Sequence, residues 1–263
     1  MGARIEPRMS PPETTPENPY RAPATGSRQA VLPVEPPVRY QPGGRVATSA
    51  FVLLLANAGV SVLTVIFWIV MWIRLARRSV TVGWLQSVLV QTLLLTVTNA
   101  VLVILTAVLF SIWYYRSYRN LLALGNATTD HGLWWAPAGF YIPVVNLFMP
   151  YLVGREIWLK SDPVNLRRGP RDRRLMPRNR SAGLVAAWWL CLVCAQLLSR
   201  VATSGMEHLR LDRLGSLFFL LILAALLSTV AAVLGALLVH AVETRQRARH
   251  AALAPTAQEP DSG

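Results

Sequence analysis

Five polar residues stand out because they lie beside or between long apolar runs, where charged and amide side chains are costly. They are Arg116, Arg119, Asn120, Asn146 and Glu156. Acids are scarce in this region, since Asp130 is the single acidic residue between positions 47 and 154. We therefore expect Glu156 to pair with Arg116 or Arg119, and the five residues to form one polar cluster. The alternative is that the two arginines anchor independently to lipid headgroups.

Other reactive residues give no catalytic pattern. Cys191 and Cys194 form a C-x-x-C pair, but it sits in an apolar run beside Trp188 and Trp189, without a second cysteine pair or a nearby histidine. The histidines are scattered along the chain, at His131, His208, His240 and His250. We expect two structural thiols, no metal site, no cofactor and no enzymatic activity.

The composition indicates a membrane protein. Of the 263 residues, 53% are hydrophobic and 15% are charged, and the apolar residues come in blocks. Lys and Arg number 26 against 13 Asp and Glu, a net charge of +13. Most of these arginines flank apolar runs, so we expect them to contact anionic headgroups rather than nucleic acid.

Four apolar runs are long enough to cross a bilayer as helices, at residues 47–73, 88–115, 182–204 and 216–240. About 20 apolar residues span a hydrocarbon core of about 30 Å. We therefore predict an all-α integral membrane protein with its membrane domain over residues 46–242.

A fifth apolar segment, residues 133–152, is interrupted by Pro137, Pro143 and Pro150. Proline removes a helix donor and bends the chain, so we predict a re-entrant or interfacial segment rather than a straight span. If it crossed fully, the chain would have five spans and its N-terminus outside. The distribution of arginines discriminates poorly between the two topologies.

The chain ends and one loop are polar. Residues 1–45 are rich in proline and residues 243–263 are polar, so we expect both to be disordered cytoplasmic tails. The start of the chain has no apolar signal-peptide region, which favours a cytoplasmic N-terminus in a bacterial inner membrane. Residues 155–181 are arginine-rich and are predicted to be a cytoplasmic loop. The P-x-x-P spacings in the first tail suit either a spacer or a ligand of aromatic grooves.

Three motifs carry a family resemblance: WYYRSYRNLLALG at 113–125, WWAPAGFYIPVVNLFMPY at 134–151, and REIW at 155–158. They resemble the bacterial family known as domain of unknown function 4328. The resemblance implies a Pro-rich or zinc-ribbon N-terminal region followed by about four membrane spans. No cysteine lies near the N-terminus, so the Pro-rich form applies. The family implies an architecture and no mechanism.

Two classes of function stay open from the sequence. We expect a membrane scaffold or regulatory protein that recruits a protein partner through the Pro-rich tail or the basic loop. The alternative is a small-solute or lipid transporter, or a channel, that uses the Pro-broken segment around Asn146. A homo-oligomer is compatible with both.

Overall fold

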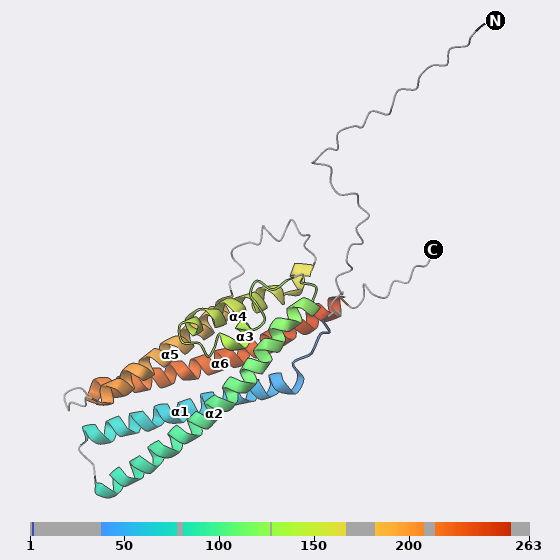
Figure 1. Ribbon diagram of the computed structural model, residues 1–263. Coiled ribbons are helices and arrows are strands. Elements are labelled where there is room, and N and C mark those ends of the chain that lie inside the picture. Colours follow the sequence, from blue (N-terminus) through green and yellow to red (C-terminus); the bar gives the residue numbers. More distant parts are fainter. Residues whose placement is uncertain are drawn as a thin grey trace. The chain divides into compact units, whose positions relative to one another are not determined.

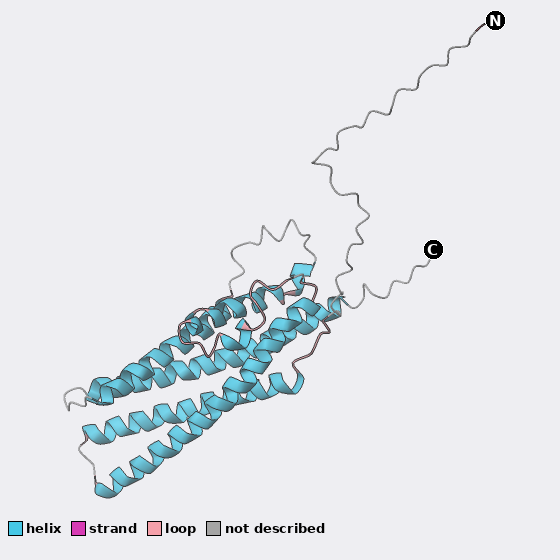
Figure 2. Cartoon of the chain, viewed as in Figure 1, coloured by secondary structure: helices cyan, strands magenta, loops and turns pink. Residues whose placement is uncertain are grey.

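A computed structural model describes Gly2 and residues 38–77, 81–126, 128–166, 182–207 and 214–253. These residues form helices and loops (Figure 2). In chain order the helices are α1 (Gly44–Ala76), α2 (Val82–Ala123), α3 (Trp135–Ala138), η1 (Val145–Leu147), α4 (Met149–Lys160), η2 (Pro163–Leu166), α5 (Gly183–Glu207) and α6 (Leu214–Leu253), where η marks short 3-10 turns.

Four of these helices are long and apolar enough to cross a membrane. They are Gly44–Ala76, Val82–Ala123, Gly183–Ser204 and Gly215–Leu253. The predicted all-α fold with four long apolar helices able to span a membrane is therefore confirmed, and these helices indicate a multi-pass membrane protein. Helices α1, α2 and α6 extend past both ends of the apolar runs that predicted them, and α5 extends past the C-terminal end of its run, because helix bonding continues into polar sequence.

Helix α6 is the central helix of the bundle, with α1 and α5 packed against it. Small residues on α6 make this close approach possible: Ala232 and Ala236 are buried, and a Cβ on Gly235 would lie 3.0 Å from Nε1 of Trp188 on α5. In a bilayer, helices gain little from the hydrophobic effect on contacting each other, so close packing of small residues provides much of the attraction.

Helix α2 packs mainly on α1, and it reaches α6 at its C-terminal end (Figure 1). Within the spans, Asn57 Nδ2 of α1 donates to Thr106 Oγ1 of α2 over 2.6 Å. Much of the rest of α2 is exposed, including Leu93, Leu94 and Ile104. In a membrane these side chains face lipid.

Helices α2 and α6 extend well beyond what a bilayer requires. They contain 42 and 40 residues, which at 1.5 Å per residue is about 60 Å, against a hydrocarbon core of about 30 Å. The sequence predicted a disordered C-terminal tail from residue 243. This prediction is wrong for residues 243–253, because α6 continues as helix to Leu253. The N-terminal tail boundary is also too late, since Tyr40, Gln41 and Gly43 make specific contacts with the bundle.

The predicted Pro-broken segment is bent, as expected. It consists of α3, turns, η1 and the start of α4. Pro137 lies in α3, Pro143 lies in a turn, and Pro150 lies in the first turn of α4. Pro150 therefore starts a helix rather than breaking one, since its missing N–H would have no helical partner at that position.

The chain folds back on itself at Gly139. A Cβ there would lie 2.8 Å from the carbonyl oxygen of Trp135 and 2.9 Å from Cβ of Met149. Helices α3 and α4 thus contact each other across the bend.

The predicted basic loop is only partly described. Its first residues, from Arg155 to Lys160, belong to α4, and η2 follows. Residues 167–181, which carry most of the loop's arginines, lie outside the described part of the chain.

The four-span topology predicts that both flanks of the broken segment lie on one side of the membrane. We expect Thr128→Cys and Val164→Cys, each made without Cys191 and Cys194, to resist an impermeant thiol reagent added outside cells. Both positions are exposed, so accessibility depends on sidedness alone. Gly83→Cys, in the first turn of α2, where a side chain meets open space, should be labelled. Labelling of Thr128→Cys from outside would establish five spans.

Candidate functional site

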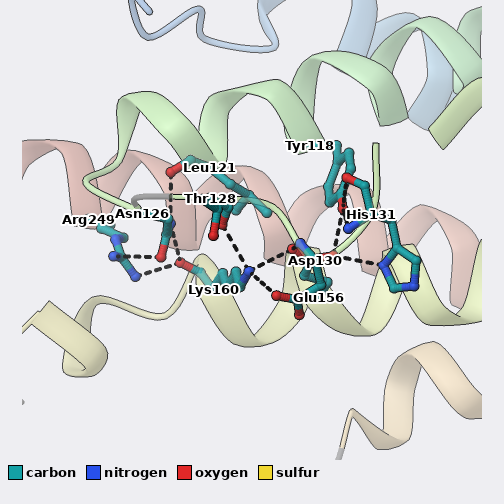
Figure 3. A network of polar contacts seen from close by, with 9 residues as sticks. All are labelled: Tyr118, Leu121, Asn126, Thr128, Asp130, His131, Glu156, Lys160 and Arg249. Atoms are coloured by element: carbon teal, nitrogen blue, oxygen red, sulfur yellow. Dashed lines mark hydrogen bonds and ion pairs between the residues drawn. The ribbon is translucent and has the colours of Figure 1, made fainter. Parts of the chain in front are cut away.

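Glu156 of α4 is a buried carboxylate, 5% exposed, whose two oxygens are both occupied by groups of the chain. Its Oε1 accepts from the backbone N–H of Asp130 and from Nζ of Lys160, both over 2.7 Å. Its Oε2 accepts from Oη of Tyr118 over 2.6 Å and lies 3.3 Å from Nδ1 of His131. Figure 3 shows these groups converging on the carboxylate. Such charge-assisted bonds offset the cost of burying Glu156.

The same contacts tie the loop after α2 to helix α4. Tyr118, fully buried on α2, accepts from the backbone N–H of His131 over 3.0 Å. Lys160 bridges Glu156 and Asp130, and it also donates to the carbonyl of Thr128 over 3.1 Å. One carboxylate and one ammonium therefore attach the loop of residues 128–131 to helix α4.

Groups of the chain already occupy both oxygens of the Glu156 carboxylate. Each Glu156 oxygen meets two groups of the chain, so an incoming metal or substrate would have to displace them. Among the residues that the structure describes, no three His, Cys, Asp or Glu side chains are grouped so as to hold a metal ion. Cys191 and Cys194 are free, half-buried thiols on α5.

A second polar cluster joins α2 and α6 to the residues before α1. The side-chain amide of Asn120 pairs with both backbone groups of Gln41: Oδ1 accepts from the N–H over 3.0 Å, and Nδ2 donates to the carbonyl over 2.7 Å. Nδ2 of Asn120 also lies 3.2 Å from Oε1 of Gln246, which is fully buried on α6. Gln246 donates to the carbonyl of Ser117 and to Oγ of Ser161. This cluster connects α2, α6 and the end of α4.

Glu243, one turn before Gln246, holds the start of α1. It accepts from the backbone N–H of Gly43 over 3.2 Å and from Nε1 of Trp113 over 3.0 Å. A Cβ on Gly43 would lie 2.1 Å from a Glu243 oxygen, so a larger residue there would displace the Glu243 carboxylate. The Tyr40 ring stacks on His250 of α6 with centroids 4.3 Å apart.

The five residues predicted to form one polar cluster do not all come together. Glu156 and Asn120 are both buried, but in the two different clusters just described. Arg119 is exposed, and Arg116 and Asn146 are half-buried. Within the described residues, Glu156 forms its ion pair with Lys160 and not with Arg116 or Arg119, so the predicted arginine partner is corrected.

Helix geometry explains this correction. At about 100° per residue, positions 116 and 119 are rotated by about 200° and 100° from Tyr118, which points at Glu156. Lys160 is the chain's single lysine and follows Glu156 by four residues. That spacing favours an ion pair on one helix face and could have identified it. Gln41, Glu243 and Gln246 have no comparable local signal, because their partners lie far away in the sequence.

The comparison with protein families covers the Glu156 cluster and part of the second cluster. A family model described as Domain of unknown function (DUF4328) matches residues 84–244. The chain belongs to this family. The resemblance inferred from the motifs is thereby confirmed. The DUF4328 match takes in Tyr118, Asn120, Glu156 and Glu243, whereas α1 and the last turns of α6 lie outside it. Neither a curated protein nor a solved structure matches the chain.

Arg249, beyond the DUF4328 match, joins two helix ends. Its guanidinium is 1% exposed and donates to the carbonyl of Leu124, at the end of α2, over 2.9 Å. It also donates to the carbonyl of Lys160, at the end of α4, over 2.5 Å and lies 3.4 Å from Oδ1 of Asn126 (Figure 3). The last carbonyls of a helix lack helical donors and carry partial negative charge, so a cation there is stabilising.

The Glu156–Lys160 ion pair predicts non-additive losses of stability. Glu156→Gln retains the side-chain shape and removes the charge. The loss of stability that it causes should therefore be smaller once Lys160→Met has removed the partner. We expect a coupling free energy of about 1 to 3 kcal/mol between contacting residues. It would be measured by unfolding the four proteins of the cycle in one detergent. The matched cycle with Arg116→Gln should be additive, and coupling there instead would restore the arginine pairing.

The geometry of Arg249 predicts that lysine cannot replace it. A lysine ammonium lacks the planar fork that reaches Leu124 and Lys160 together. Each stranded buried carbonyl costs about 1 to 3 kcal/mol. We expect Arg249→Lys to lower the melting temperature nearly as much as Arg249→Gln. Arg247→Lys, on the same helix with an exposed side chain, should have little effect. A fully stable Arg249→Lys would contradict the capping role.

Proposed function

We propose that the protein is a non-enzymatic membrane scaffold that holds its Pro-rich N-terminal tail at the membrane surface to recruit a protein partner. The observation that carries the proposal is the pairing of Asn120 with both backbone groups of Gln41. These two hydrogen bonds fix the residue from which the tail departs. Tyr40 and Gly43, on either side, are held by His250 and Glu243.

The polar clusters support a structural role for this region. Their residues bond mainly to one another and to backbone groups, as in a rigid framework, and Glu156 is shared between α2, the loop of residues 128–131 and α4. A catalytic centre would instead direct polar atoms to a position that a substrate can reach. We infer that these residues stabilise the end of the bundle.

Exposed arginines surround the same region. Arg39 and Arg45 flank the clamped segment, Arg119 follows Tyr118 on α2, and Arg155 precedes Glu156 on α4. By the positive-inside rule, their concentration favours placing this end and both termini on the cytoplasmic side, against anionic headgroups.

The proposal predicts that partner binding depends on the tail and on its clamp. The full chain, tagged at its C-terminus, would be purified from native membranes in mild detergent. A specific partner should copurify with it, be lost on deletion of residues 1–37, and be weakened by Asn120→Leu, which frees Gln41. Arg119→Gln, one residue away and exposed, serves as the matched control.

Melting temperatures of the same preparations separate loss of binding from loss of fold. Unchanged stability with loss of the partner in the deletion variant supports the scaffold. A partner retained without residues 1–37 contradicts it. The transport alternative would appear as solute flux through vesicles containing the purified chain alone.

A further inference from the structure

The Pro-broken segment, residues 133–152, exposes large apolar side chains. Trp134 is 81% exposed, Tyr141 60%, Val144 73% and Phe148 63%. Its inner side is packed, because Phe140 contacts the rings of Phe110, Tyr114 and Trp189. The exposed side chains are therefore presented outward by a fixed backbone.

The contacts of the segment place it at the depth of lipid-facing residues. Oη of Tyr141 lies 3.1 Å from Oγ of Ser111 and 3.5 Å from the carbonyl of Ala107 on α2. On α2 the exposed residues at this level are apolar, Val108 and Ile112, whereas exposed Arg119 lies two turns further on.

The beginning of the segment lies closer than Tyr141 to the end of the bundle that carries the polar clusters. His131 is bonded to Tyr118 of α2, and Arg155, after the segment, is exposed. From Tyr118 down to Ser111 and Ala107 the distance along α2 is roughly 10 to 16 Å, at 1.5 Å per residue. That is no more than about half of a 30 Å hydrocarbon core, or one leaflet.

We propose that residues 134–148 form a wedge in one leaflet and give the protein a preference for membranes in which that leaflet is convex. The wedge inserts apolar side chains on one side of the bilayer only, and binding by such in-plane segments depends on curvature and lipid packing. The occupant of the exposed apolar surface is acyl chain, because the surface is continuous in depth with the lipid-facing residues of α2. This inference does not depend on partner recruitment.

The test compares the orientation of the full chain in small and large vesicles of one lipid composition. Thr128→Cys, in the chain without Cys191 and Cys194, reports orientation through labelling by an impermeant thiol reagent before and after lysis. Outward-facing wedges are favoured where the outer leaflet is more convex. We expect the outward-to-inward ratio to rise as vesicle radius falls.

Matched variants distinguish an effect of the wedge from an effect of the rest of the protein. Trp134→Ala, Val144→Ala and Phe148→Ala together should abolish the dependence on radius, because these exposed side chains fill the leaflet. Leu89→Ala, Leu93→Ala and Ile104→Ala, which are 62% to 64% exposed on α2, should leave it intact. Equal size dependence in both triple variants, or none in the parent, would overturn the proposal.

A second measurement keeps the test valid if the triple variant misfolds. A spin label at Val144→Cys should be accessible to oxygen and shielded from a water-soluble nickel reagent, as expected for a site in the leaflet. Exposure to the nickel reagent contradicts insertion. A second copy covering the surface would appear as a dimer lost in the wedge variant without any dependence on vesicle radius, which also rejects the proposal.

Discussion

The carbonyl groups that end α2 and α4 are brought close together, the first buried and the second partly buried, so their missing hydrogen bonds must come largely from the chain. Arg249 satisfies them from α6, through donors to Leu124 and Lys160 held by one rigid guanidinium. A buried helix end without donors would be strongly destabilising, so the meeting of three helices depends on this side chain. Once α6 is held against both helix ends, Gln246 and Glu243 on its preceding turns face Asn120 and Trp113 of α2. The contacts of Gln246 and of Glu243 with α2 are thus consequences of one helix register.

The interactions within the membrane spans differ in kind from those beyond the spans. Within the spans, α1 and α5 approach α6 through small residues such as Ala236 and Gly235, with occasional polar pairs such as Asn57 and Thr106. Beyond them, charge-assisted and amide hydrogen bonds dominate. Lipid competes with apolar packing but offers no equivalent of the bonds made by Glu156 or Arg249. The polar end therefore determines how α2, largely exposed elsewhere, is oriented relative to α6.

This division also relates the two proposals. The clamp on Gln41 and the wedge around Val144 lie at different depths on the same half of α2, next to Asn120 and to Ala107, respectively. A scaffold that holds a partner-binding tail at the surface and responds to the shape of one leaflet would place that partner at particular regions of the membrane. Both features need the rigid frame that the polar clusters provide.

The sequence by itself determined the four apolar helices, because long uncharged runs are stable as helices in lipid and give a local signal. It also identified the broken segment, from its prolines, and Glu156 as a buried acid, from its scarcity. Only the tertiary structure decided the partners. Lys160 rather than Arg116 pairs with Glu156 because helix rotation points the arginine elsewhere, and residue 41 meets residue 120 because separate helices converge. The tail boundaries were misplaced for the same reason: residues 38–43 and 243–253 look polar and solvated in isolation, and they become ordered through bonds to residues distant in the chain.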